Sequence, residues 1–218
     1  MVKAHLQQLG IEETANVLTH GIGLVLSLAG FVVLTAMAVT YGDVWHISSS
    51  IVYGLSLVIL YTASTVYHST ISPERKSFLQ MVDHCCIYLL IAGSYTPFLL
   101  VVLRDGLGFG MLAVVWTVAV AGILIKIMFR GRFKALGIVL YLALGWLGVV
   151  AAEPMYTALG MIPLTLVAGG GLSYTAAMIF FGWKSLKHHH AIFHVFILAG
   201  SILHYAVIAI YVMPGAGS

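Results

Sequence analysis

Seven long apolar runs separated by short polar breaks occupy almost the whole chain. They extend over about residues 17–41, 47–69, 78–103, 109–129, 135–152, 156–181 and 190–212. A helix that spans a bilayer needs about 20 predominantly apolar residues. Because backbone polar groups must be satisfied within lipid, each run is expected to be an α-helix. The pattern predicts an all-α integral membrane protein, with residues 1–218 forming a single domain that is a seven-transmembrane-helix bundle.

The composition excludes a soluble domain. Charged residues make up 8% of the chain and hydrophobic residues 61%, whereas a soluble domain carries roughly 25% charged residues. The mean hydropathy is +1.05. The segment before Asn16 contains Lys3, Glu12 and Glu13 and no apolar run, so we expect no cleaved signal peptide.

The basic residues indicate the orientation of the bundle. All Lys and Arg residues except Arg104 fall before the first span or in and around the breaks that follow the second, fourth and sixth spans. The positive-inside rule therefore predicts a cytoplasmic N-terminus and a C-terminus outside. Scattered short basic loops with no aromatic platform do not suit nucleic acid, so we expect no nucleic-acid partner. No soluble protein partner is evident from the sequence either.

Three histidines and an aspartate are expected at one depth in the bundle. His190 and His194 lie one helical turn apart at the start of the seventh span, so both rings share a helix face. His68 ends the second span and Asp83 lies one to two turns into the third. With the predicted topology, all four residues fall in one layer near the cytoplasmic face. Ionisable groups in membrane spans indicate function, and this layer predicts a metal site.

The chemistry of these residues favours zinc. Three imidazoles from His68, His190 and His194 suit Zn²⁺ where no redox ligand is present, and three protein ligands leave a fourth position open, as in catalytic zinc sites. Asp83 then has three alternative roles: general base, hydrogen-bonding partner of a ligand, or direct ligand. Ser64 precedes His68 by one turn, so its hydroxyl either reaches the same pocket or bonds back to its own helix.

Other polar residues are expected outside the ligand set. We expect His188 and His189 to be solvated in a loop, His204 to be a hydrogen-bonded packing residue, and His84 to face away from Asp83. Asn16 and His20, again four residues apart, either brace the metal layer or cap the first helix. The adjacent Cys85 and Cys86 are expected to be buried packing residues, since no C-x-x-C spacing is present.

Five short motifs occur in one order along the chain: ETANVLTHG at 13–21, STVYH at 64–68, DH at 83–84, GSYTP at 93–97 and HAIFH at 190–194. Together they resemble the bacterial haemolysin III branch of the progestin and adipoQ receptor family. The resemblance implies seven helices and a zinc held by His68, His190 and His194, with Asp83 and Ser64 as the motif aspartate and serine. It also implies a place in the bacterial cytoplasmic membrane.

The resemblance leaves two classes of function open. Adiponectin receptors of this family are linked to ceramide hydrolysis, and the wider superfamily includes alkaline ceramidases, which implies a zinc-dependent hydrolase of a membrane lipid amide or ester. The alternative is a membrane-homeostasis sensor or a proton or cation transporter with a structural zinc. A bis-histidine haem explains the His190–His194 pair poorly, because haem takes its ligands from two faces. No span carries a polar stripe suited to a wide haemolytic pore.

Overall fold

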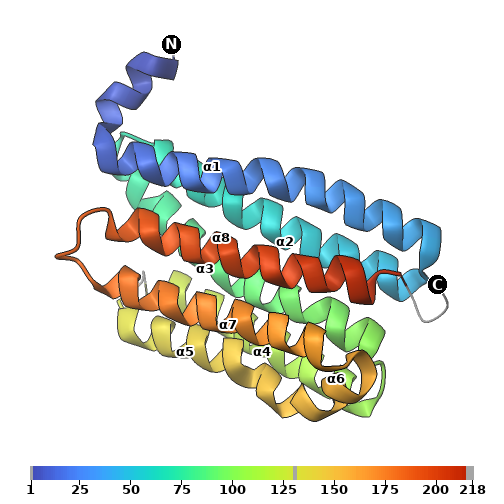
Figure 1. Ribbon diagram of the computed structural model, residues 1–218. Helices are drawn as coiled ribbons and strands as arrows, with labels where there is room; N and C mark the ends of the chain where they lie inside the picture. The colour runs from blue at the N-terminus through green and yellow to red at the C-terminus, as the bar shows by residue number, and fades with distance from the viewer. Residues whose placement is uncertain (1, 130–131, 215–218) are drawn as a thin grey trace.

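The computed structural model describes residues 2–129 and 132–214. This part of the chain is a bundle of helices whose axes lie roughly parallel, and it contains no strand. The chain ends lie at opposite ends of the bundle (Figure 1). The helices are α1 (Val2–Tyr41), α2 (Val44–Ser69), α3 (Pro73–Pro97), α4 (Gly106–Met128), α5 (Lys134–Trp146), α6 (Ala152–Leu159), α7 (Met161–Gly182) and α8 (His189–Val207). Three short segments extend or join them: η1 (Phe98–Val102) after α3, η2 (Leu147–Ala151) between α5 and α6, and η3 (Ile208–Val212) after α8.

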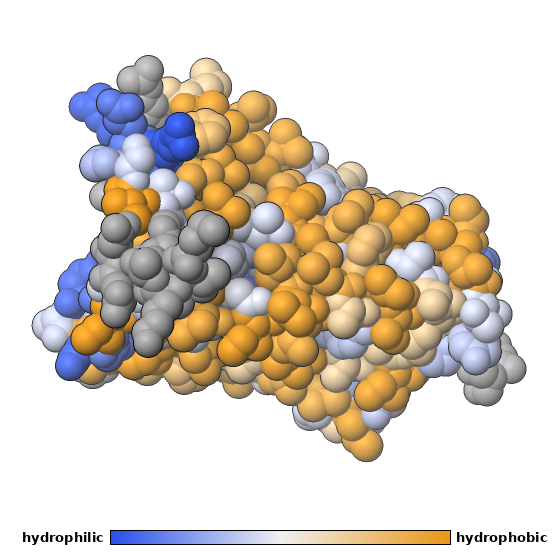
Figure 2. All heavy atoms as spheres, turned by 90° about the horizontal axis from the view of Figure 1, so that it is seen from above, coloured by the Kyte–Doolittle hydropathy of each residue, from blue (hydrophilic) through white to orange (hydrophobic). Residues whose placement is uncertain are grey.

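Seven segments of the described residues are long and apolar enough to cross a membrane, which confirms the predicted seven-helix bundle. They are Leu9–Tyr41, Val44–Ser69, Pro73–Val102, Gly106–Met128, Ala135–Leu159, Met161–Gly182 and His189–Val212. Hydrophobic residues cover most of the length of the face seen in Figure 2, and hydrophilic residues gather mainly at the end that holds the N-terminus. The Arg130–Gly131 break and the tail at 215–218 lie outside the described residues.

The end of the fifth span differs from the prediction. The sequence suggested a break at Glu153–Pro154, but the span continues through η2 and α6 to Leu159. Pro154 lies in the first turn of α6, where a missing N–H and a fixed φ are compatible with a helix. The break falls instead at Gly160, whose φ of 83° and ψ of −177° lie in a region that is essentially restricted to glycine.

Gly160 gives a test of this turn. No heavy atom lies within 4 Å of a Cβ built on Gly160, so Gly160→Ala acts through the backbone alone. We expect it to destabilise the protein by roughly 1–3 kcal/mol, measured by thermal unfolding in detergent. Gly110→Ala is the matched control, because Gly110 also has open space and lies in the helical part of α4; there alanine stabilises by up to about 1 kcal/mol. Equal effects of the two substitutions would contradict the assigned turn.

The packing of the helices gathers three chain segments at one end of the bundle. α1 packs on α2 and α8, α2 also packs on α3, and α7 packs on α8. The end from which α1 starts, which we call the N-terminal end, is also where α2 finishes and α3 and α8 begin (Figure 1). The layer predicted from the sequence therefore lies at the N-terminal end.

Cys85 and Cys86 are buried and form no disulfide, as expected for packing residues.

Candidate metal centre

His68, His190 and His194 lie together at the N-terminal end of the bundle. One ring nitrogen from each lies within 4.8 Å of those of the other two, and the Nε2 atoms of His68 and His190 are 3.2 Å apart. His68 is 2% exposed and His194 1% exposed, while His190 is partly buried. Three imidazole nitrogens that converge in this way fit a divalent metal that accepts nitrogen ligands, zinc among them.

The ends of two helices position these rings. His68 occupies the last turn of α2, which finishes at Ser69 and is followed by an extended Thr70. α8 begins directly after His188, whose positive φ of 58° turns the chain out of the preceding loop. The first two turns of α8 therefore face the end of α2, as the spacing of His190 and His194 suggested.

A carboxylate and a hydroxyl hold the Nδ1 atoms of two of the three rings. Glu13 Oε2 lies 2.6 Å from His68 Nδ1, and Thr19 Oγ1 lies 3.1 Å from His194 Nδ1. Lys76 Nζ donates to Glu13 Oε1 at 2.5 Å, and Asn16 Nδ2 donates to Glu13 Oε2 at 3.3 Å. Histidines that ligate a metal usually donate their other N–H to a carboxylate or similar acceptor, which fixes the ring.

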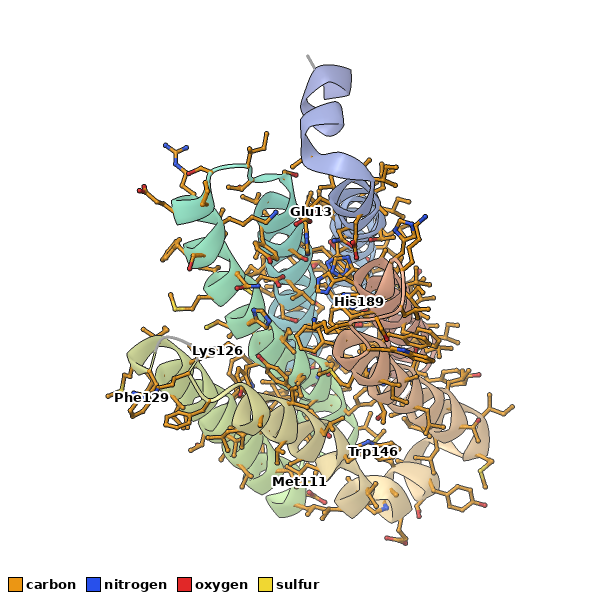
Figure 3. All side chains as sticks on the ribbon, turned by 90° about the vertical axis from the view of Figure 1, so that its left-hand side faces the viewer. Glu13, Met111, Lys126, Phe129, Trp146 and His189 are labelled. Atoms are coloured by element: carbon orange, nitrogen blue, oxygen red, sulfur yellow. The ribbon has the colours of Figure 1, made fainter. Side chains whose placement is uncertain are left out.

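Glu13 was not among the site residues that we predicted. The sequence pointed to Glu13 only through its position in the first of the five motifs. Glu13 and His68 are 55 residues apart in the chain, so the sequence did not indicate that their side chains meet. Viewed from the N-terminal end, Glu13 lies on the same side of the bundle as His189, whereas Lys126 and Phe129 lie across it (Figure 3). Glu13 therefore belongs to the α1, α2 and α8 side of the bundle, where the three histidines meet.

Removing the Glu13 carboxylate should weaken metal binding without abolishing it. We expect Glu13→Gln to lower the metal affinity by about 10- to 100-fold, the usual effect of losing a residue that orients a ligand, in competition with a chelating indicator. Glu12→Gln is the matched control, because Glu12 is exposed and adjacent in the chain. An unchanged affinity in Glu13→Gln would show that the carboxylate has no part in positioning His68.

Asp83 lies beside the three histidines but is not part of the ligand group. It is 8% exposed on α3, and within the described residues the group of convergent ligand atoms comprises the histidines alone. Ser64 is fully buried on α2. Its Oγ makes no hydrogen bond to another residue in the described part of the chain, but it lies close to the Asp83 carboxyl. The hydroxyl therefore does not bond back to its own helix.

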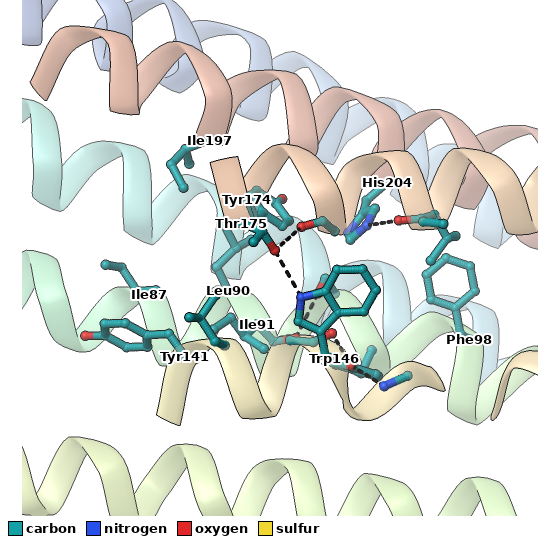
Figure 4. Close-up of a pocket in the computed structure, with 18 of the residues that line it drawn as sticks. Ile87, Leu90, Ile91, Phe98, Tyr141, Trp146, Tyr174, Thr175, Ile197 and His204 are labelled. Atoms are coloured by element: carbon teal, nitrogen blue, oxygen red, sulfur yellow. Dashed lines mark hydrogen bonds between the residues drawn. The ribbon is translucent and has the colours of Figure 1, made fainter. Parts of the chain in front are cut away.

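A long cavity reaches the site from inside the bundle. Its volume is about 380 Å³, and Ser64, Asp83 and His194 line it at the N-terminal end. From there it continues past Ile87, Leu90, Trp146 and other apolar side chains of α3, α5, α7 and α8 (Figure 4). Along α3, η1 and the residue that follows it, the lining runs from Asp83 to Leu103, which is roughly 30 Å at about 1.5 Å per residue.

The other histidines considered in the sequence analysis lie outside the ligand group, which was identified among the described residues. His204 Nε2 meets the Val167 carbonyl at 3.1 Å, which confirms a hydrogen-bonded packing role. His84 Nδ1 meets the Gln80 carbonyl at 2.5 Å, away from Asp83. The expectation that His188 and His189 are solvated is wrong, because both are partly buried and His189 Nδ1 meets the Phe180 carbonyl at 3.1 Å. The His189 ring is thereby held against α7, and both side chains are only partly exposed.

His20 braces the site rather than capping a helix. α1 is interrupted by a kink at Gly10 and then continues without a break to Tyr41, so neither Asn16 nor His20 lies at a helix start. The His20 ring stacks on the His194 ring with centroids 3.4 Å apart and planes 18° apart. It also meets the edge of the Tyr61 ring at 5.1 Å. Of the two alternatives left by the sequence, the structure supports the bracing role.

Comparisons with known proteins agree with the motifs. A family model described as haemolysin-III related matches residues 10–205. A hemolysin-3 homolog of Bacillus subtilis (strain 168) is 43% identical over 200 residues, which covers 92% of this chain and 94% of that protein. Hemolysin-3 of Bacillus cereus is 42% identical over 205 residues, with 94% of each chain covered. The human monocyte to macrophage differentiation factor is 29% identical over 205 residues, 90% of this chain and 83% of that protein.

Proposed function

We propose that this membrane protein, which belongs to the haemolysin-III related family, is a zinc-dependent, ceramidase-like hydrolase of a lipid amide or ester. The observation that carries the proposal is the convergence of His68, His190 and His194 beside a long apolar cavity. An apolar pocket with a few convergent polar groups is where a small-molecule site is expected.

The cavity suits the acyl chain of a membrane lipid. Its lining is almost entirely apolar beyond the N-terminal end, and the bilayer around the bundle is the local source of long apolar ligands. An acyl chain that occupies this space leaves its polar head beside Asp83 and His194. Hydrophobic burial then holds the substrate, and the polar end places the bond to be cleaved next to the three histidines.

The residues around the head end supply the remaining chemistry. Zinc, when bound, polarises a carbonyl oxygen and makes water more acidic. Asp83 accepts a proton from the attacking water as the new C–O bond forms, and returns it to the leaving nitrogen or oxygen as that bond breaks. Glu13 holds the His68 ring through Nδ1 and keeps Nε2 available, and Ser64 offers a hydroxyl to the head of the substrate.

We further propose that the site faces the cytoplasm in a bacterial inner membrane. The support is the distribution of basic residues, because Lys76 and Lys184 lie at the N-terminal end while Arg104 lies near Asp43 at the other end. Cytoplasmic loops carry an excess of Lys and Arg. Cysteine accessibility labelling of intact cells tests this orientation at Lys184→Cys and Arg104→Cys.

Turnover in proteoliposomes tests the hydrolase. The purified protein, with its metal content measured, is incubated with a broad panel of defined lipid amides and esters, and released fatty acid is quantified before and after removal of the metal with a chelator. We expect chelator-sensitive release from at least one lipid class. Stoichiometric zinc without turnover of any lipid on the panel would eliminate the enzymatic proposal.

One observation favours the alternative, a proton or cation transporter or sensor with a structural zinc. A short hydrogen-bonded chain links α2, α8 and α7 inside the bundle, from Tyr61 OH to Ser201 Oγ at 2.9 Å and between Ser201 Oγ and Tyr174 OH at 3.1 Å. Together with Asp83 and the histidines, these groups are of the kind that form proton relays in membranes. Proton or sodium flux in proteoliposomes that Asp83→Asn abolishes, with zinc retained, would favour this alternative.

A further inference from the structure

His20 has a hydrogen-bonding capacity that nothing in the described part of the chain satisfies. The residue is 3% exposed, and neither Nδ1 nor Nε2 has a hydrogen-bond partner among the described residues. Buried polar groups in native proteins are nearly always paired, and an exception calls for an explanation such as a ligand or an ordered water. His20 lines the cavity next to His194, so a molecule in that cavity can supply the missing partner.

Three side chains from three helices share this end of the cavity. His20 comes from α1, Ser64 from α2 and Asp83 from α3, and all three line the cavity. Ser64 Oγ, like the His20 nitrogens, makes no hydrogen bond to another described residue, although it lies close to the Asp83 carboxyl. We call these three residues the polar recess. A neutral imidazole offers one donor and one acceptor, a hydroxyl one donor and two acceptor sites, and a carboxylate acceptors only. Acceptors therefore outnumber donors in the recess.

The hydrogen-bonding groups of the recess favour a headgroup that carries a donor. Within the described residues, no Lys or Arg lines the cavity, and Asp83 is its one acidic lining residue. An uncharged headgroup that carries a hydrogen-bond donor matches the surplus of acceptors, and an amide N–H supplies that donor. An ester of the same shape supplies none and leaves a buried acceptor unpaired.

We propose that His20 is a specificity-determining residue that makes the site select amide lipids over ester lipids, by hydrogen-bonding the uncharged amide headgroup. This inference rests on the proposed function, because it takes the acyl chain to occupy the cavity. It narrows the substrate from an amide or ester to an amide. A site built to hydrogen-bond an N–H rejects an analogue that lacks it more strongly than an apolar pocket rejects a missing methylene.

Binding of two isosteric probes tests the proposal without turnover. N-Methyl palmitamide and methyl palmitate differ in the N–H group, and their dissociation constants are measured with metal-loaded protein in detergent by competition with a fluorescent fatty acid. We expect the wild type to bind the amide at least about tenfold more tightly, a difference of about 1.4 kcal/mol. His20→Phe keeps a flat ring against His194 but has no nitrogen, and should bring the two constants within about threefold.

Three control measurements separate this role from a structural one. The metal content of His20→Phe should equal that of the wild type, and His20→Asn, which restores a hydrogen-bonding group, should recover part of the discrimination. His84→Phe changes a histidine next to Asp83 that does not line the cavity, and should leave the ratio unchanged. His20→Asn also provides a test if the phenylalanine variant does not fold.

Each contrary result has a distinct meaning. Equal binding of both probes by the wild type, or undiminished discrimination in His20→Phe, overturns the role of His20. Loss of metal in both His20 variants overturns it in favour of a purely structural contact with His194. Selective amide binding with no hydrolysis of any lipid supports the inference and overturns the hydrolase alone. If the wild type binds neither probe, the acyl-binding part of the proposed function fails, and this inference fails with it.

Discussion

Replacing any one of the three convergent histidines by alanine should empty the metal site. We expect His190→Ala, His194→Ala and His68→Ala each to lose most of the bound metal, measured by elemental analysis of the purified protein. Each variant removes one of three ligand atoms that lie within 4.8 Å of one another. The two histidines left in each case cannot hold zinc tightly against water and chelators. The loss should exceed the roughly 10- to 100-fold weakening typical of residues that only orient a ligand.

His189→Ala is the most stringent control for this prediction. His189 is adjacent to His190 in the chain, but its Nδ1 meets the Phe180 carbonyl and it is not part of the convergent group. His188→Ala serves as a second control from the same segment. Both variants should keep their metal. If either control empties the site while His190→Ala leaves it full, the ligands have been assigned in the wrong register.

The sequence predicted the spans well because the bilayer imposes a simple constraint. Backbone polar groups must be satisfied inside each segment, so every apolar run of sufficient length had to be a helix. The convergence of His68 with the His190–His194 pair followed from the same constraint, since the alternation of spans placed all three at one depth. The break at Glu153–Pro154 was misplaced because Pro is compatible with the first turn of a helix. Gly160 lies between two apolar residues, so the sequence around it did not indicate a turn.

Contacts between distant helices could not be predicted in the same way. Depth fixes how far along a helix a residue lies, but it does not fix which neighbour its side chain meets. Glu13 could therefore not be paired with His68, and a bracing role of His20 in the metal layer was left as one of two alternatives. The residues that line the cavity could not be predicted either, because the lining depends on side-chain packing among α3, α5, α7 and α8.

Removing the Asp83 carboxylate should separate metal binding from chemistry. We expect Asp83→Ala to keep most of its metal, because Asp83 lies outside the group of convergent ligand atoms in the described residues. Lipid hydrolysis should fall to background, since the attacking water loses its proton acceptor. Metal content by elemental analysis and fatty acid release from proteoliposomes are measured on the same preparation. Asp83→Asn is the isosteric companion, which retains the volume and one hydrogen-bonding oxygen but cannot act as a base.

The comparison of Asp83→Ala with His68→Ala decides between the two classes of function. If Asp83→Ala loses as much metal as His68→Ala, Asp83 is a fourth direct ligand and the site has no open position. A closed site with four protein ligands is typical of structural zinc, and the hydrolase proposal would give way to the sensor or transporter. If Asp83→Ala keeps its metal and loses hydrolysis while Asp83→Asn behaves in the same way, the carboxylate acts as a base. Retained metal with undiminished hydrolysis in both variants would remove Asp83 from the mechanism.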